Sequence, residues 1–310
     1  QSFIGGRPVT YGAAIIGPAV KGPVGIPTAV SSFSQYSAIF GGVVESGSQF
    51  YTYLNTVSAQ NYFSQGGESL LVTRVVSGSF TSAVTSGSQA GANNSGIITV
   101  GFNNVNDAAY LKTAFQLTTI SQGTIMNNYQ AADSAGGTLV SGSADNLRWE
   151  ITSVNTSSGA FALLLRRGND TQNQKAILET YNNLSMDPTA ANYIARAIGN
   201  TYQTVEQDGT DYYLKTNGDY PNRSAYVYVS QVNTPTPGYF NNDGTPKNQY
   251  TGSLPTVGSG SFTSAVGSNI SIAQAKFNED ISSTNIQGLA PNDYTASIKL
   301  LSNQDDYQFN

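Results

Sequence analysis

The stretch Ala13–Gly42, AAIIGPAVKGPVGIPTAVSSFSQYSAIFGG, decides the fold class. Its apolar run Ala13–Ile16 predicts a short buried strand that stops at Gly17 and Pro18, because this dipeptide interrupts regular structure. Ile26–Val30 predicts a second strand of the same kind. The two runs are close in sequence, and the segment that follows them has a different periodicity, which indicates a layer that mixes strands and helices.

A helix is predicted directly after the second strand. Ser31 or Ser32 supplies an N-cap, and Gly41 and Gly42 end the helix because glycine adopts left-handed dihedral angles at little cost. The apolar side chains at helical spacing are Phe33, Tyr36, Ile39 and Phe40.

The next two segments extend the same layer. Ser46 or Ser48 is expected to cap a second helix that closes at 66–67. Its apolar positions i, i+4 and i+7 are Phe50, Leu54 and Val57. The following run Ser69–Val76, SLLVTRVV, is apolar on both faces apart from Arg74. Such a strand is typical of a sheet covered by helices on each side.

An identical octapeptide, SGSFTSAV, occurs at Ser77–Val84 and again at Ser259–Val266. Two copies in a chain rich in these residues can arise from composition alone, or they can mark the start and end of an inserted segment. Two copies are too few for a solenoid, which needs at least three repeats.

The residues between the two copies read mostly as β-structure. Residues 147–152 alternate, with Trp149 on the apolar face, and 161–165 alternate in the same way after a turn at 155–159. We expect an antiparallel pair with Trp149 in a core. Helices are predicted at 174–182, from the spacing of Ile177, Tyr181 and Leu184, and from Asp187-Pro188 to Gly199.

Three further segments follow along the chain. Ala225–Val229 predicts a strand, and 233–258 predicts a long exposed loop or projecting hairpin because it is rich in Pro, Gly and Asn. Residues 296–301, ASIKLL, predict a strand, and the alternation of Tyr307 and Phe309 predicts that the chain is entering another. Because the given sequence stops at this point, we expect either that it is an excerpt of a longer chain or that its last strand pairs with a strand of a partner. The start at Gln1 indicates a processed terminus or an excerpt.

Composition excludes several classes of function. The 310 residues contain no Cys and no His, which removes disulfides, Cys/His zinc sites and His-based nucleophile activation. Charged residues are 11% of the chain, and the net charge is −5. The densest basic pair, Arg166-Arg167, is expected at a solvated strand end, so nucleic acid is not an expected partner. No apolar run is long enough to span a membrane. We expect no catalytic, metal or cofactor residues.

Acidic pairs offer an alternative. Asp208/Asp211 and Asp305/Asp306 resemble in composition the carboxylate pairs of glycosidases or calcium sites, but Asp-Gly at 208–209 and 243–244 indicates turns first. The tyrosine pair Tyr212-Tyr213 suits a sugar face, but the pattern favours packing in a core or interface.

Two stretches together resemble the contractile phage tail sheath proteins. The first has the pattern strand, G-P-A-x-K-G-P, strand, S-F-x-x-Y-x-x-x-F-G-G, helix, G-G and a V-x-R-V strand. The matching positions include Gly17, Pro18, Lys21, Gly22, Pro23, Phe33, Tyr36, Phe40, Gly41, Gly42 and Arg74. The second, Glu179–Asn200, resembles E-x-[FY]-x-N-L-S-x-D and the helix after it. Its matching positions are Leu184, Ser185, Asp187 and Tyr193.

The resemblance implies an architecture. It implies an α+β protein whose α/β-layer platform is discontinuous, formed by residues 1–76 and 270–310, with an inserted, outward-facing β-rich domain at 77–269 that carries two short helices. Members of the family have an N-terminal arm and a C-terminal domain after a D-Y-x-F-N strand, which here is Tyr307–Asn310. The candidate subunit-interface residues at the two ends are Phe3, Ile4, Tyr307 and Phe309.

The resemblance also implies a function. Copies of a sheath subunit polymerise around a tail tube and contract from a metastable extended state, which drives the tube through a host envelope and leads to ejection of the viral genome. The implied partners are other copies of the chain, the tail tube protein, and baseplate and tail terminator proteins. The implied location is the virion tail, after assembly in the host cytoplasm. A receptor- or glycan-binding protein of the virion surface is the alternative, and a carboxylate-based glycosidase is a third.

Overall fold

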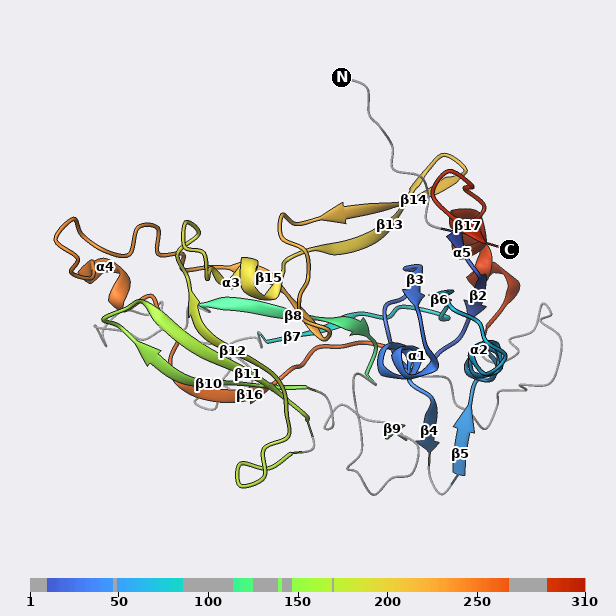
Figure 1. The fold of residues 1–310 in the computed structure, drawn as a ribbon, viewed down its shortest axis with the longest axis horizontal. Helices are drawn as coiled ribbons and strands as arrows, with labels where there is room; N and C mark the ends of the chain where they lie inside the picture. The colour runs from blue at the N-terminus through green and yellow to red at the C-terminus, as the bar shows by residue number, and fades with distance from the viewer. Residues whose placement is uncertain are drawn as a thin grey trace.

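The computed structural model describes residues 10–46, 49–85, 114–124, 139–140, 147–168, 170–267 and 289–309. Helices and several small sheets occur together, so the chain is α+β as predicted. The molecule is elongated, with the N-terminal sheet and its helices at one end and α4 (Asn248–Thr251) at the other (Figure 1).

The first sheet is built from the segments that opened the sequence. Strand β6 (Leu70–Arg74) lies between β2 (Ala13–Gly17), which is parallel to it, and β3 (Thr28–Val30), which is antiparallel. Figure 1 shows α1 (Phe33–Phe40) and α2 (Leu54–Ser64) below this sheet and α5 (Thr295–Leu301) near the upper end of β2. Every residue of β6 is buried, as expected for a strand that is apolar on both faces.

Helix α1 confirms its predicted limits. The hydroxyl of Ser32 accepts a hydrogen bond from Gln35 N at 3.1 Å, which caps the first turn. Gly41 ends the helix with a φ of 76°. The side of the helix that faces the sheet joins a hydrophobic cluster made by Ala19, Val30, Tyr36, Phe40, Ala59, Leu70 and Val72.

The second predicted helix starts later than expected. Strands β4 (Val43–Ser46) and β5 (Gln49–Thr52) pair antiparallel, and β9 (Leu139–Val140) adds on the β4 side. Ser46 therefore ends a strand, and the other predicted cap, Ser48, lies outside the described residues. Helix α2 runs from Leu54 to Ser64. The predicted apolar face was wrong, because Leu54 and Val57 are exposed while the buried residues are Asn55, Thr56 and Ala59. Thr56 is buried beside a polar partner on α1, because the hydroxyl of Tyr36 lies 3.2 Å from Thr56 Oγ1.

A second hydrophobic cluster lies between two further sheets. One sheet has the order β12-β11-β10-β16 and the other the order β15-β8-β7. Phe115 of β8 and Phe161 of β11 stack across the gap with ring centroids 5.6 Å apart. Trp149 is buried in this cluster, as predicted. The bounds are β7 (Ser82–Val84), β8 (Phe115–Gln122), β10 (Arg148–Asn155), β11 (Ala160–Arg166), β12 (Ile177–Ser185), β15 (Val227–Val232) and β16 (Gly258–Ser261).

The predicted helix at 174–182 was wrong, because residues 177–182 belong to strand β12 and 174–176 are in the loop before it. The pairing of β12 with β11 is interrupted by two register shifts, and Asn183, at the second, has a φ of 57°. Each bulge adds a residue to the strand. The apolar side chains of β12 therefore recur at uneven intervals of four and three residues, which imitates a helix in sequence.

The helix predicted from Asp187 begins seven residues later. Helix α3 covers Ile194–Ile198 and ends at Gly199, as expected. Asp187 instead closes a turn, since its Oδ1 accepts from Thr189 N at 2.9 Å. Segment 233–258 is a long loop that carries α4, in line with the prediction of a projecting segment.

A hairpin from the middle of the chain lies beside the last helix. Strands β13 (Tyr202–Asp208) and β14 (Asp211–Asn217) form it, and α5 packs against β14. Lys299 Nζ donates to Thr210 O at 3.2 Å. The predicted strand at 296–301 was wrong. A 3-10 turn at Pro291–Tyr294 leads into α5, whose buried residues recur at helical intervals of three and four: Ser297, Leu300 and Leu301.

The two copies of SGSFTSAV lie side by side and run antiparallel. Val84 N donates to Thr263 O and Thr263 N donates to Val84 O, both at 2.9 Å. Thr81 N donates to Val266 O, also at 2.9 Å. Thr81 and Thr263 are the fifth residues of the two copies, and Val84 and Val266 are the eighth. Each fifth residue therefore pairs with the eighth residue of the other copy, so the two copies are related by a local twofold axis. The chain leaves the first sheet through the first copy.

The two ends of the described chain also meet. Strand β1 (Thr10–Tyr11) pairs in parallel with β17 (Gln308–Phe309), and these two strands form a sheet of their own. The prediction of a strand at Phe309 is confirmed, but its partner lies in the same chain.

Candidate functional site

The residues of the first motif converge on the buried guanidinium of Arg74, which is 1% exposed. Its Nη1 donates to Gly22 O at 2.7 Å and to Gln122 O at 2.8 Å. Its Nε donates to Ala19 O at 3.2 Å, and Nη2 approaches Val20 O at 3.4 Å. Burial lowers the pKa of Arg74 to about 10, against a smaller opposing effect from Tyr53. The side chain therefore gathers carbonyl oxygens of the Gly-Pro loop around one cation.

The same loop is joined to strand β8. Gly22 N donates to Ser121 Oγ at 2.9 Å, and Val24 N donates to Gln122 Oε1 at 2.8 Å. In the reverse direction, Gln122 N donates to Gly22 O at 3.2 Å. Arg74 and these three bonds connect the first sheet to the β-rich part of the chain, so we name loop 17–25 with Arg74, Ser121 and Gln122 the junction.

Gly22 is required by the geometry of the junction. Its φ of 105° is a conformation that L side chains rarely adopt, and a Cβ here would lie 2.8 Å from Phe40 Cδ1. The neighbouring Lys21 N donates to Phe40 O at 3.1 Å, which fixes the loop to the end of α1. The Lys21 side chain is 5% exposed, and burial lowers its pKa to about 8.

Lys21 makes stability depend on pH. Between pH 8 and its ordinary value of 10.5 the unfolded chain holds a proton that the folded chain has released, so stability rises with pH in this window. We expect the wild-type free energy of unfolding to rise, relative to Lys21→Met, by about 2 kcal/mol from pH 7 to pH 10. Urea unfolding at several pH values measures the difference. Lys299→Met removes an exposed lysine, so its free energy of unfolding should change with pH in the same way as that of the wild type. If the difference in this free energy between the wild type and Lys21→Met were the same at every pH, the assignment to Lys21 would be contradicted.

The motif positions are all internal or half-buried. The buried ones are Gly17, Pro18, Lys21, Gly22, Tyr36, Phe40, Gly41, Arg74, Leu184, Ser185 and Asp187, and the half-buried ones are Pro23, Phe33, Gly42 and Tyr193. They build the frame of the molecule and present few polar groups to solvent. Their arrangement positions chain segments relative to one another.

The second motif is centred on Asp187, which is 8% exposed. Its Oδ2 accepts from Gly238 N at 3.0 Å and Tyr239 N at 3.3 Å, and its Oδ1 accepts from Thr189. Burial pushes the pKa of Asp187 upward, but these hydrogen bonds outweigh it and hold the pKa below its ordinary value. The motif thus anchors the long loop 233–258, a role that the sequence did not indicate.

The predicted interface ends are only partly described. Phe3 and Ile4 lie outside the described residues. Tyr307 is half-buried and precedes β17, while Phe309 is 41% exposed within it. The pKa of Tyr307 is raised to about 12 by burial and by the nearby Asp306 and Tyr11.

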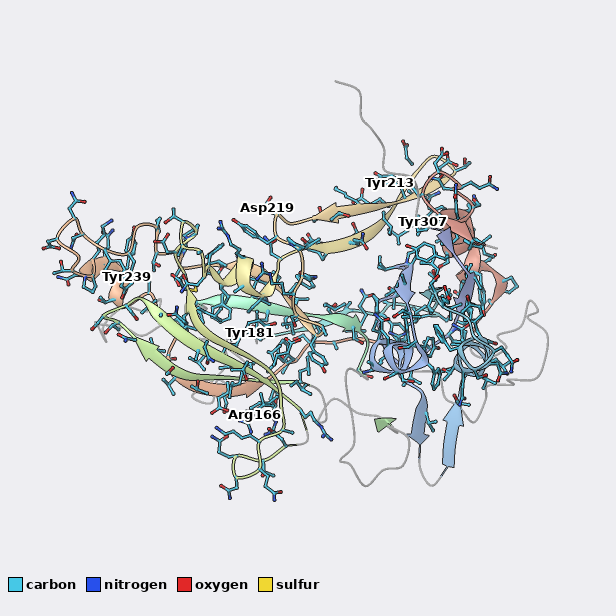
Figure 2. The ribbon with its side chains drawn as sticks, viewed as in Figure 1. Arg166, Tyr181, Tyr213, Asp219, Tyr239 and Tyr307 are labelled. Atoms are coloured by element: carbon cyan, nitrogen blue, oxygen red, sulfur yellow. The ribbon has the colours of Figure 1, made fainter. Side chains whose placement is uncertain are left out.

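A buried ion network was missed in the sequence. The expectation of a solvated strand end at Arg166 was wrong, because its side chain is 1% exposed. It forms a two-point contact with Asp170 at 2.7 and 2.9 Å and an ion pair with Glu150 at 2.7 Å. Lys175 Nζ lies 2.7 Å from Glu150 Oε1. In Figure 2 Arg166 lies at the base of the loop that joins β11 to β12, which this network holds in place.

The acidic pairs lie in turns. Asp208 and Asp211 face each other at the end of the β13–β14 hairpin, and Asp243 accepts from Thr245 within its own loop. Among the described residues, no group of three or more acidic side chains is placed to hold a metal ion. None of the helices in the described part of the chain has the length and apolar character needed to cross a membrane.

Comparison with known proteins finds similarity among solved structures. Neither protein-family models nor curated proteins match the chain. Among solved structures, it is similar to the sheath tail protein of Desulfitobacterium hafniense, with 11% sequence identity and a TM-score of 0.25. The match covers 78% of this chain and 38% of the other, so this chain spans well under half the length of that protein. At this TM-score the likeness does not establish a shared fold.

Proposed function

We propose that this chain is a structural subunit of a contractile tail sheath, in which copies polymerise around a tube and contract from a metastable extended state. The sequence motifs support the proposal, since the positions they share with sheath proteins form the internal frame of the molecule. The observation that carries the proposal is the isolated parallel pair β1–β17, which joins the two ends of the described chain.

The β1–β17 pair favours assembly for a physical reason. A two-stranded sheet is marginally stable by itself, and its outer edges have no strand beside them among the described residues. Such edges are templates for a strand from another chain. A neighbouring copy that adds a strand here would link subunits in a non-closing, head-to-tail way, which produces a helical filament.

The proposal includes an organisation of domains. Residues 1–76 with 270–310 would form the platform that polymerises, and residues 77–269 would form an outward-facing insertion. The antiparallel contact of the two SGSFTSAV copies supports this division, because an insertion starts and ends at neighbouring points of its host domain. The tube, baseplate and tail terminator proteins are the proposed partners, and the virion tail is the proposed location.

A change in β17 tests the proposal. Proline lacks the backbone donor of a strand, so Gln308→Pro is expected to weaken the β1–β17 pair and to abolish filaments, while the two hydrophobic clusters of the monomer stay folded. Gln308→Val keeps the donor and is the matched control. Electron microscopy and sedimentation of the chain produced together with its tube protein provide the measurement. Filaments of normal length from Gln308→Pro would count against strand addition at this edge.

A further inference from the structure

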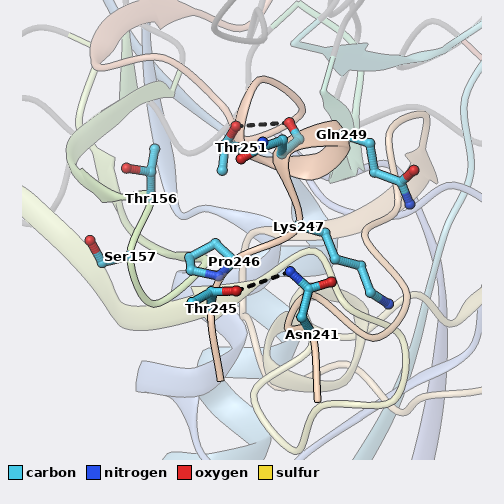
Figure 3. Close-up of a pocket in the computed structure, with 9 residues that line it drawn as sticks. Thr156, Ser157, Asn241, Thr245, Pro246, Lys247, Gln249 and Thr251 are labelled. Carbon is cyan, nitrogen blue, oxygen red and sulfur yellow. Dashed lines mark hydrogen bonds between the residues drawn. The ribbon is translucent and has the colours of Figure 1, made fainter. Parts of the chain in front are cut away.

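The end of the molecule farthest from the first sheet holds a cavity of about 800 Å³ (Figure 3). One wall is the turn between β10 and β11, which contributes Thr156 and Ser157. The other wall belongs to the loop around α4 and includes Lys247, Asn248 and Gln249. The cavity therefore lies between two loops that are far apart in sequence.

Both walls are fixed by contacts behind them. Tyr239 OH donates to Thr156 O at 2.7 Å, which joins the α4 loop to the β10–β11 turn. The ring of Tyr239 also lies so close to Gly159 that a Cβ there would be 2.8 Å from it. Asp187 holds the start of the loop through Gly238 N and Tyr239 N. The cavity is thus formed before any ligand arrives, which lowers the entropic cost of binding.

The lining has one consistent chemistry. Apart from Pro246 and Lys247, every lining residue carries a hydroxyl or an amide, and none carries a carboxylate. The side chains of Ser157, Asn248 and Gln249 make no hydrogen bond to any described residue, so their donors and acceptors are available. A divalent cation would need carboxylate oxygens, and a phosphate chain would need several cations. A polyhydroxylated ligand fits hydroxyls and amides that each donate and accept.

An apolar surface adjoins these polar groups. Phe240 is 44% exposed and pairs through its backbone with Pro246, which lines the cavity. Aromatic rings beside hydroxyl and amide groups suit the C–H face and the hydroxyl edge of a sugar ring at once. We propose that this cavity binds a short stretch of carbohydrate chain. The inference is independent of polymerisation, because every residue that carries it belongs to one copy.

A glycan array with the whole 310-residue protein tests the inference. The probes are neutral hexasaccharides of glucose, N-acetylglucosamine and mannose, together with hexagalacturonate, and hits are titrated by calorimetry. We expect at least one probe to bind with a Kd on the order of 1 mM or tighter. Asn248→Ala/Gln249→Ala should weaken this binding at least ~10-fold, a loss on the scale of a few lost hydrogen bonds to sugar hydroxyls. Phe240→Ala, which removes the aromatic face, should also weaken it.

The control is a matched pair of exposed amides on α2, Gln60→Ala/Asn61→Ala, which should leave the affinity unchanged. Lys247→Met distinguishes acidic from neutral ligands. It should weaken the binding of hexagalacturonate, which is negatively charged, and leave the binding of the neutral hexasaccharides unchanged. Failure of every probe to bind would overturn the inference, and so would binding that survives Asn248→Ala/Gln249→Ala unchanged. Folding of each variant is checked by thermal unfolding, and both double variants change exposed side chains only.

Discussion

Replacing Arg74 with methionine is expected to lower the free energy of unfolding by about 3–5 kcal/mol. Methionine fills much of the space but donates no hydrogen bonds. The carbonyl oxygens of Ala19, Gly22 and Gln122 would then stay buried without the guanidinium. Each buried acceptor that loses its donor costs about 1–3 kcal/mol, part of which local rearrangement recovers. Urea unfolding gives the free energy.

Two comparisons make the Arg74 test specific. Arg223→Met removes an exposed arginine and should change stability by no more than about 0.5 kcal/mol. Arg74→Lys keeps the charge but has no planar fork, so it should recover part of the loss. Hydrogen exchange should show faster exchange at Gly22 N and Val24 N in Arg74→Met, because these amides bind β8 across the junction. Unchanged exchange there would contradict the role of Arg74 in joining the two parts.

Replacing Arg166 with methionine is expected to cost a similar amount, about 3–5 kcal/mol at pH 7, because two buried carboxylates would lose their shared cation. Asp170 and Glu150 are 8% and 7% exposed and accept three charged hydrogen bonds from Arg166. Arg148→Met is the matched control, since Arg148 is 3.8 Å from Asp170 and 38% exposed, and it should cost less than about 1 kcal/mol.

The loss caused by Arg166→Met should shrink in acid. Burial pushes the pKa of Glu150 upward, but hydrogen bonds from Lys175 and Arg166 outweigh it and hold the pKa below 4.5. The wild type therefore keeps this contribution above pH 4.5 and loses it as pH falls through the lower folded value. In Arg166→Met, protonation of Glu150 in acid removes a buried negative charge that has lost Arg166 as its partner. Denaturation at pH 7 and at pH 3 gives, for each pH, the difference in the free energy of unfolding between the wild type and Arg166→Met. A difference that is as large at pH 3 as at pH 7 would argue against a charged origin.

Local signals predicted part of the fold. The cap at Ser32 and the stop at Gly41 set the limits of α1, and strict alternation around Trp149 predicted its strand. The failures have physical causes. Bulges in β12 broke the two-residue period, and Asn183 occupies a left-handed conformation that the sequence pattern does not reveal. The helix at 295–301 was missed although its buried residues follow helical spacing, because the short apolar run was assigned to a strand.

The candidate site was less predictable than the fold. The sequence marked Arg74 as the polar exception in an apolar strand, but its contact with Gln122 joins residues 48 positions apart. The alternation of residues 147–152 puts Glu150 on the face opposite Trp149, yet Glu150 is 7% exposed and pairs with Arg166 and Lys175. The cavity beside α4 depends on two loops that are far apart in sequence and are joined by the hydrogen bond from Tyr239 OH to Thr156 O. Such contacts depend on tertiary structure and leave no periodic trace in the sequence.

The central claim is that this chain works as a repeated building block of a contractile sleeve. Cryo-electron microscopy of purified contractile particles that contain the chain tests it most directly. The account predicts copies arranged on a helix around a tube, with a strand from a neighbouring copy beside the β1–β17 pair. Particles whose sleeve contains no copy of this chain would contradict it.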